Sequence, residues 1–240
     1  MFDLAATDAM PRAAQRSTLI PALPQSPQFV AALRHSGQSP LLLNRLQDMV
    51  VLRRTIGGLP LAMVNRADLV KPARLLEILQ EEGLRRTPVI LSPERPVPDL
   101  ARLGALPLMT PASVATLAIA QDSEARRAGL EQKWRNRLKH AESQALRVTR
   151  QSMPLDPAHW LLQAEAKQQG QRGYRNWPQD LTLAYVRENP GKAKLFQAFG
   201  GKEVVAAVLI LCHGTCASCG VVEKVSPGAF VIFCVGHEVP

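Results

Sequence analysis

The sequence contains no apolar run long enough to cross a membrane as a helix. Its longest run, Val204–Cys212, has nine residues, whereas a membrane-spanning helix needs about 20. A secretory signal is not visible either, because the first twenty residues carry Asp3 and Asp8 and lack a continuous apolar core. We therefore expect a soluble protein of the cytoplasm, without a membrane span, whose mature chain starts near Met1.

Cysteine is scarce, and all four cysteines lie in the last 29 residues. Secreted disulfide frameworks are not usually distributed in this way, which agrees with a reducing compartment. A radical S-adenosylmethionine cluster normally begins a barrel that supplies the substrate site, yet only 21 residues follow Cys219, so we expect no metal. The residues with metal-ligand spacing on which this alternative depends are Cys212, His213, Cys216, Cys219, Cys234 and His237.

Motifs of hydrolases and NTPases are also missing. No phosphate-binding loop of the Gly-x-x-x-x-Gly-Lys type occurs. Five histidines are present, but residue order alone identifies no Ser/His/Asp arrangement. These two classes of enzyme have no support in the sequence.

Positive charge is abundant, with a formal net charge of +9 and a pI near 9.9. Such a balance favours an anionic partner, which could be a nucleotide cofactor, a nucleic acid or a membrane surface. Between Ser123 and Arg150, eight Lys or Arg residues face three Glu residues, a local excess of +5. The positive field is therefore concentrated in this segment.

The basic segment is predicted to be one amphipathic helix from about Ser123 to Gln144, with apolar residues at helical spacing on one face. Large aromatic side chains are usually buried, so we expect Trp134 to pack in the core. Glu142 is expected to be a surface carboxylate in an ion pair with Lys139 or Arg147 rather than a general base. The apolar face comprises Leu130, Trp134, Leu138, Ala141 and Ala145.

Before this segment, the pattern predicts strands and two helices. Runs at 49–54 and 59–64 flank Ile56-Gly57-Gly58 and indicate a hairpin. A helix over 70–82 is closed by Gly83. The remaining predicted elements are a helix at 27–34 and strands at 88–91 and 115–118.

After the basic segment, the pattern predicts a sheet with two helices. The run at 203–211 is fully apolar and suits a central strand, paired with 194–198 through a hairpin about Gly200-Gly201. The remaining predicted elements are an exposed edge strand at 146–149 and helices at 159–169 and 179–187.

Three short motifs follow one another along the second half of the chain. Residues 133–142 read Lys-Trp-Arg-Asn-x-Leu-x-x-Ala-Glu, the turn Arg172-Gly173-Tyr174 begins 30 residues after Glu142, and the apolar strand leads to His213-Gly214. The combination resembles the GNAT acyltransferase superfamily, in the branch with FemAB-like and BioF2-like acetyltransferase domains. The resemblance runs from about Leu41 to Ala217 and includes residues 91–93 and 103–111.

This resemblance implies an α/β fold in which helices flank a mixed sheet, built as two GNAT-like pieces with the second one incomplete. The implied reaction is N-acyl transfer from acetyl-CoA or another acyl-CoA to an amine acceptor, with aminoacyl-tRNA as a less favoured donor and no metal. Such transfer depends mainly on positioning the amine and stabilising the oxyanion. The acceptor and the oligomeric state are not implied.

By the same resemblance, Lys133, Arg135 and Asn136 contact an anionic or polar substrate. Arg172 and Tyr174 border the acceptor pocket, where Gly173 permits a tight turn. The alternative for the first three is a solvated basic face with a local hydrogen bond from Asn136. The alternative for the turn is a helix C-terminus with Tyr174 packed back.

The predicted organisation is a Pro-rich lead (1–40), a reduced N-terminal GNAT-like half (41–120) and a C-terminal acetyltransferase domain (121–240) that is incomplete after about residue 217. In the family, a glycine-containing turn that opens a helix after the central strands holds the cofactor pyrophosphate. Here Cys219–Lys224 and Ser226-Pro227-Gly228 follow instead, so we expect a truncated or frame-shifted reading frame. The alternative functions are a catalytically inactive remnant and a basic RNA-binding module that uses residues 123–150.

Overall fold

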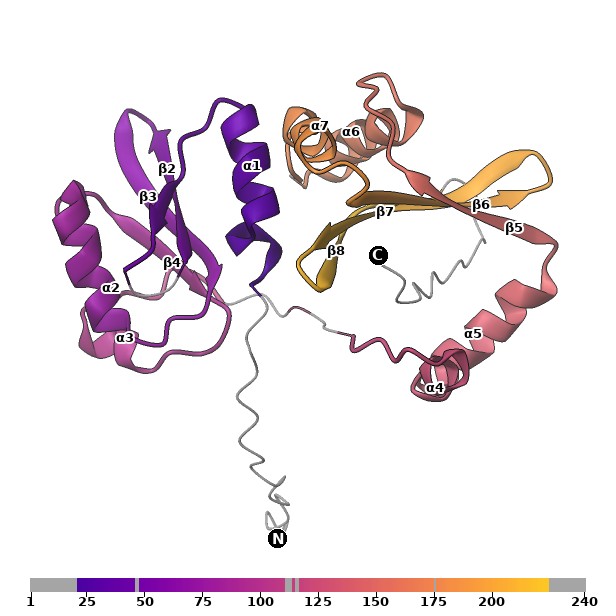
Figure 1. Ribbon diagram of the computed structural model, residues 1–240, viewed down its shortest axis with the longest axis horizontal. Helices are drawn as coiled ribbons and strands as arrows, with labels where there is room; N and C mark the ends of the chain where they lie inside the picture. The colour runs from indigo at the N-terminus through magenta and orange to yellow at the C-terminus, as the bar shows by residue number, and fades with distance from the viewer. Residues whose placement is uncertain (1–20, 46–47, 111–113, 115–116, 175, 225–240) are drawn as a thin grey trace, which may run out of the picture.

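Two four-stranded sheets and the helices around them make up the computed structural model (Figure 1). In the described part of the chain, no helix is long and apolar enough to span a membrane. The structure describes residues 21–45, 48–110, 114, 117–174 and 176–224.

The first sheet combines antiparallel and parallel pairing. Its first three strands are antiparallel neighbours, with Gly57 and Gly58 at φ 58° and 82° in the hairpin turn. The fourth strand is parallel to the third, which requires a crossover; α2 (Pro72–Leu79) and the π-helical turn η2 (Gln80–Leu84) make it. The strands in sheet order are β1 (Leu41–Leu43), β2 (Met49–Ile56), β3 (Leu59–Ala67) and β4 (Val89–Pro93), with α3 (Asp99–Arg102) after them.

The second sheet is antiparallel throughout its described strands. β7 (Glu203–His213) lies inside the sheet and is mostly buried, and its residues Ala207, Leu209 and Leu211 join the core on one face. Helices α6 (Trp160–Arg172) and α7 (Gln179–Glu188) supply the apolar residues that pack on this sheet. The other strands are β5 (Leu146–Ser152), β6 (Ala193–Gly200) and β8 (Cys216–Lys224).

Helix α1 (Pro27–His35) joins the two sheet-containing units. Ser26 caps it by accepting the Phe29 N–H at 3.2 Å. Its residues Phe29 and Leu33 share one buried cluster with α6, α7, β6 and β7, and that cluster also includes Val50 and Leu52 of β2. Figure 1 shows α1 between the first sheet and α7.

The 3-10 helix η1 (Leu23–Gln25) precedes α1 and is fastened to the first sheet. The buried Gln25 amide accepts the Val50 N–H at 2.8 Å and donates to the carbonyls of Val50 at 3.2 Å and Asn65 at 2.7 Å. The Gln25 side chain thus makes hydrogen bonds to β2 and β3 of the kind that a neighbouring strand would make.

The predicted α/β class, with two sheets and flanking helices, is confirmed. So are both glycine hairpins, the helix at 27–34, the edge strand β5 and the helices at 159–169 and 179–187. Of the predicted strand at 115–118, residues 115 and 116 lie outside the described residues. Leu117 and Ala118 are described and belong to no strand.

The single helix predicted for 123–144 is wrong, because the chain forms α4 (Ser123–Ala128) and α5 (Gln132–Ser143). Asp122 caps α4 by accepting the Ala125 N–H at 2.7 Å. Gly129 ends α4, as its low helix propensity favours, and Glu131 is extended at ψ 151° before α5 begins.

The predicted packing of Trp134 in the core is also wrong. No residue of α5 is buried, and Trp134 is 43% exposed. The Arg137 guanidinium lies over the Trp134 ring, 4.9 Å from its centroid. Glu142 is an ion-paired surface carboxylate as expected, but its partner is Arg127 of α4, at 3.0 Å from Nη1 to Oε2.

Leu33→Ala tests the role of α1. The Leu33 side chain is fully buried in the shared cluster, and removing such a side chain costs about 2–5 kcal/mol. We expect urea denaturation to show that loss, whereas the exposed neighbour variant Arg34→Ala changes stability by less than about 0.5 kcal/mol. Equal stabilities of the two variants would contradict the assignment of α1 to the core.

Candidate functional site

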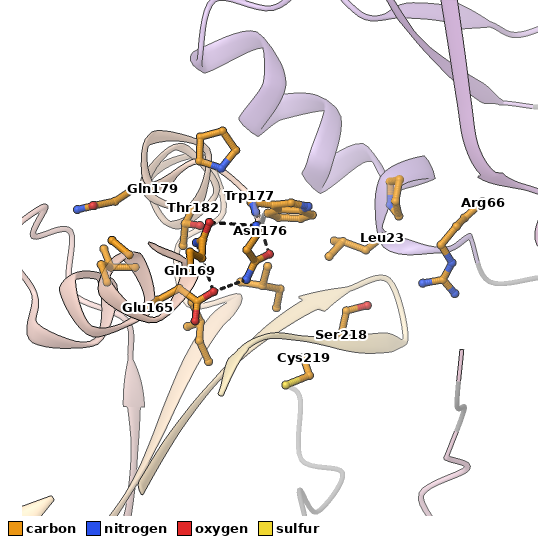
Figure 2. A pocket seen from close by; sticks show the side chains of 16 residues that line it. Leu23, Arg66, Glu165, Gln169, Asn176, Trp177, Gln179, Thr182, Ser218 and Cys219 are labelled. Atoms are coloured by element: carbon orange, nitrogen blue, oxygen red, sulfur yellow. Dashed lines mark hydrogen bonds between the residues drawn. The ribbon is translucent and has the colours of Figure 1, made fainter. Parts of the chain in front are cut away.

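A pocket of about 560 Å³ lies where the two units meet. α6 and α7 form one wall, β7 and β8 form the floor, and the first unit adds Leu23, Pro24 and Arg66 (Figure 2). Apolar walls with a few polar groups are typical of small-molecule sites. The polar and charged residues that line it are Arg66, Glu165, Gln169, Asn176, Gln179, Thr182 and Ser218.

Glu165 is the buried charge of the pocket. It projects from α6 at the spacing of the buried Leu161 and Leu162, and only 6% of it is exposed. Its Oε1 accepts hydrogen bonds from Asn176 Nδ2 at 2.9 Å and Gln169 Nε2 at 3.4 Å. A buried carboxylate requires such donors, because an unsatisfied charge in a protein interior is costly.

Tyr174 completes the donors around Glu165. Helix α6 ends at Gly173, which adopts the left-handed conformation at φ 69° and donates to the Gln169 carbonyl. The chain then turns back, and the one proton of the Tyr174 hydroxyl has two acceptors within reach, Gln168 Oε1 at 2.9 Å and Glu165 Oε1 at 3.1 Å. Each of these bonds reaches Oε1, so Oε2 has no donor among the residues that the structure describes.

Arg66 supplies the opposite charge. It stands at a bulge in β3, where the register with β4 shifts between Asn65 and Ala67, and its φ is 51°. Its Nε and Nη2 each donate to a different oxygen of Glu94 at 2.8 Å. This bidentate pair raises the pKa of Arg66 and fixes the guanidinium beside the pocket.

Ser218, on the pocket floor, forms a hydrogen bond with the buried His213. His213 is 3% exposed, and its Nε2 lies 3.0 Å from Ser218 Oγ. Burial lowers the pKa of His213, and the positive charge of Arg66 lowers it further, although the Pro21 backbone opposes the shift. The imidazole is therefore neutral at neutral pH and can accept a proton.

The three predicted binding residues of the basic segment lie on α5, outside the residues that line the pocket. Arg135 donates to the Ala128 carbonyl at 2.9 Å and thereby ties α5 to α4, while Asn136 accepts from Gln132 at 3.1 Å. Lys133 is exposed. Contact of these three with a substrate stays a prediction.

The two residues predicted beside the acceptor pocket differ in position. Arg172 is exposed at the end of α6, whereas Tyr174 contacts the pocket residue Glu165. The turn geometry agrees with the alternative of a helix C-terminus with Tyr174 packed back. Their role in acceptor binding stays a prediction.

The sequence did not point to Glu165, Arg66 or Ser218, and it indicated His213 only as a possible metal ligand and as part of the motif at the end of the apolar strand. One signal for Glu165 was available, because a carboxylate at i+4 from Leu161 lies on the apolar face of a helix. The positions of Arg66 and Ser218 depend on a strand bulge and on strand register. Neither feature has a pattern in the local sequence.

The cysteines with metal-ligand spacing do not assemble into a cluster of three or more ligands in the described part of the chain. Cys212 lies on the central strand, and burial raises the pKa of its thiol. Cys219 lines the pocket from β8. Cys234 and His237 lie outside the described residues.

No family model matches the sequence, and no curated protein does. Among solved structures, the one titled "Crystal structure of FemX" is similar, with a TM-score of 0.49 and 13% sequence identity. The similarity covers 79% of this chain and 53% of the FemX chain, so this chain spans about half the length of that protein. No residue role is transferred from FemX.

The lowered pKa of His213 makes stability depend on pH. The folded state holds the imidazole neutral, so the unfolded state binds more protons once the pH falls below the ordinary value of 6.5. We expect urea denaturation to show a loss of stability between about pH 7.5 and about pH 5.5 that His213→Asn reduces. The exposed control variant His140→Asn retains the wild-type loss, and an equal loss in His213→Asn would contradict the assignment.

Proposed function

We propose that the protein is an N-acyltransferase that transfers an acyl group from a thioester to an amine held in the pocket. The observation that carries this proposal is the buried carboxylate of Glu165, of which Oε2 has no donor among the described residues. Oε2 is not among the buried atoms that lack a partner, so it is open to the pocket, where an amine nitrogen can donate to it. The family resemblance agrees with this reaction.

The acceptor amine would bind with its N–H toward Glu165 Oε2. A fixed carboxylate orients the nitrogen. Holding two reactants in the correct orientation lowers the barrier to their reaction. When the amine attacks the acyl carbonyl, it must lose a proton, and a carboxylate within hydrogen-bond reach can accept it. The products are an amide and a thiol.

The donor would occupy the apolar part of the pocket. Ala166 and Trp177 offer apolar surface to an acyl chain. Among the described contacts of Arg66, the bonds to Glu94 use only Nε and Nη2, which leaves Nη1 for an anionic group. A pyrophosphate also favours backbone N–H groups at a helix start, but no helix follows β7 in the described residues, which end at Lys224. Acetyl-CoA is therefore the first donor to test, and smaller acyl thioesters are the second.

Glu165→Gln tests the proposal with little change in shape. The variant keeps an oxygen for Asn176 but loses the charge that binds and deprotonates the amine. We expect thiol release from acetyl-CoA in the presence of primary amines to fall by about 100-fold or more. Titration calorimetry should show that acetyl-CoA still binds.

The control variant Glu203→Gln removes an exposed carboxylate at the start of β7 and should retain the wild-type rate. Transfer at that rate by Glu165→Gln would contradict the proposed role. A wild-type chain that binds neither a thioester nor an amine would contradict the acyltransferase and favour the inactive remnant.

RNA binding by α4 and α5 is the second candidate function, and the exposed Trp134 is the observation that favours it. An exposed aromatic ring beside Arg137, on a helix with no buried residue, offers a stacking surface within a basic segment. Stacking on aromatic side chains combined with phosphate contacts is how single-stranded nucleic acid is bound without sequence preference.

Trp134→Ala tests this second candidate. Loss of one stacked base weakens binding by about 1–3 kcal/mol, so we expect the dissociation constant for single-stranded RNA to rise about 10-fold. Fluorescence anisotropy should also show that the wild-type affinity falls as salt increases. The control variant Leu106→Ala removes an apolar side chain that is 81% exposed and should bind as the wild type does. Salt-independent binding, or equal affinities of the two variants, would contradict RNA binding by this segment.

A further inference from the structure

Strand register brings His213 and Ser218 to one face of the second sheet. The β7–β8 hairpin pairs Leu211 with Ser218 and His213 with Cys216. Successive residues of a strand point to opposite faces, so His213 shares a face with Leu211 and stands diagonally opposite Ser218. Leu211 and Ser218 both line the pocket, which places Ser218 at its floor with the His213 ring next to it.

The two side chains have the geometry of a nucleophile and its base. Ser218 Oγ is 3.0 Å from His213 Nε2, within the range of a hydrogen bond. A ring with its proton on Nδ1 accepts the serine O–H at Nε2. Nδ1 is buried and has no hydrogen-bond partner within 3.5 Å among the described residues, although the Pro21 backbone is near enough to the ring to raise its pKa as an acceptor.

The surroundings distinguish the two members of the pair. His213 is almost fully buried, whereas Ser218 is partly exposed to the pocket. In Figure 2, Ser218 lies on the β8 side of the pocket, between Arg66 and the Glu165 side. The hydroxyl is therefore accessible to a ligand, while water reaches the imidazole poorly.

We propose that Ser218 carries the acyl group covalently between the donor and the amine, with His213 as its base. This inference rests on the proposed function for the amine acceptor and goes beyond it in the covalent step. The substrates are acyl thioesters and activated acyl esters with a small apolar acyl group, because Ala166 and Trp177 add apolar surface to the pocket.

Each step balances in atoms and protons. Ser218 Oγ bonds to the acyl carbon as its proton passes to His213 Nε2, and the carbon–sulfur bond then breaks. The leaving thiolate takes the proton from His213, which leaves an acyl-serine and a neutral imidazole. The amine, held and oriented by Glu165, then attacks the acyl-serine, and its proton passes to His213 and from there to Ser218 Oγ as the amide forms. In this covalent route His213 takes the proton that Glu165 would take in direct transfer, and Glu165 only positions the amine.

The experiment uses the full chain, p-nitrophenyl acetate and no amine, so it tests the covalent step separately from transfer. We expect a burst of about one equivalent of p-nitrophenolate and, by peptide mass spectrometry, one acetyl group on Ser218. Ser218→Ala should lose this label. His213→Gln should acylate about 100-fold more slowly, as expected for loss of a general base.

One further variant serves as a control for the label. Ser143→Ala removes an exposed hydroxyl that donates to the His140 carbonyl at 2.7 Å and lies outside the pocket, so it should label as the wild type does. Circular dichroism should show that all variants are folded. A label on Cys219 or on lysines, or an unchanged label in folded Ser218→Ala, would overturn the inference. If acylation fails while amine-dependent transfer persists, only the covalent step is wrong; if Ser218 is acylated but no amine accepts the group, the proposed acceptor is wrong.

Discussion

The pocket depends on the attachment of one short segment to both units. The Gln25 amide holds η1 to β2 and β3, and a few residues later Phe29 and Leu33 of α1 enter the core of the second unit. The chain between these two attachments is too short to let the two units move independently. Leu23 and Arg66 are thereby fixed opposite α6, and the space between them becomes a pocket.

Glu165 and Arg66, the two charged residues of the pocket, are stabilised in different ways. Glu165 is stabilised by neutral donors from the end of α6 and the turn after it, so its negative charge is not cancelled by a cation among its described contacts. Arg66 is partly neutralised by Glu94 and held by two bonds. A carboxylate without a countercharge attracts a cationic or N–H-bearing ligand strongly, whereas the paired guanidinium mainly orients an anionic one. The asymmetry favours an amine as the group that is recognised.

Elements that depend on local chemistry could be predicted from the sequence. Gly57, Gly58 and Gly201 have positive φ at the predicted hairpins, because only glycine adopts this conformation without strain. The apolar run of β7 predicted a central strand, and the structure has it there. These signals come from residues that are close together both in the chain and in space.

The features that the sequence did not predict correctly depend on contacts between residues far apart in the chain. Trp134 has the spacing of a core residue, but the sequence does not say whether a second surface covers its helix, and none of the described elements buries it. Glu165 resembles any helical glutamate until the turn at Gly173 brings Tyr174 and Asn176 back to it. Tertiary contacts decide both environments, and they override the propensity of each residue.

The antiparallel β7–β8 hairpin explains how the hydrogen-bonded side chains of His213 and Ser218 and the core share one sheet. Leu209 and Leu211 belong to the buried cluster, yet they also line the pocket. His213, two residues further along the same face, extends that face past the core to the end of β7, where Ser218 on β8 meets it. A shift of one residue in this register would move Ser218 to the opposite face and separate it from the imidazole. The register shift between Leu209 and Ile210 lies beyond the pair, so the regular part of the hairpin holds the two side chains together.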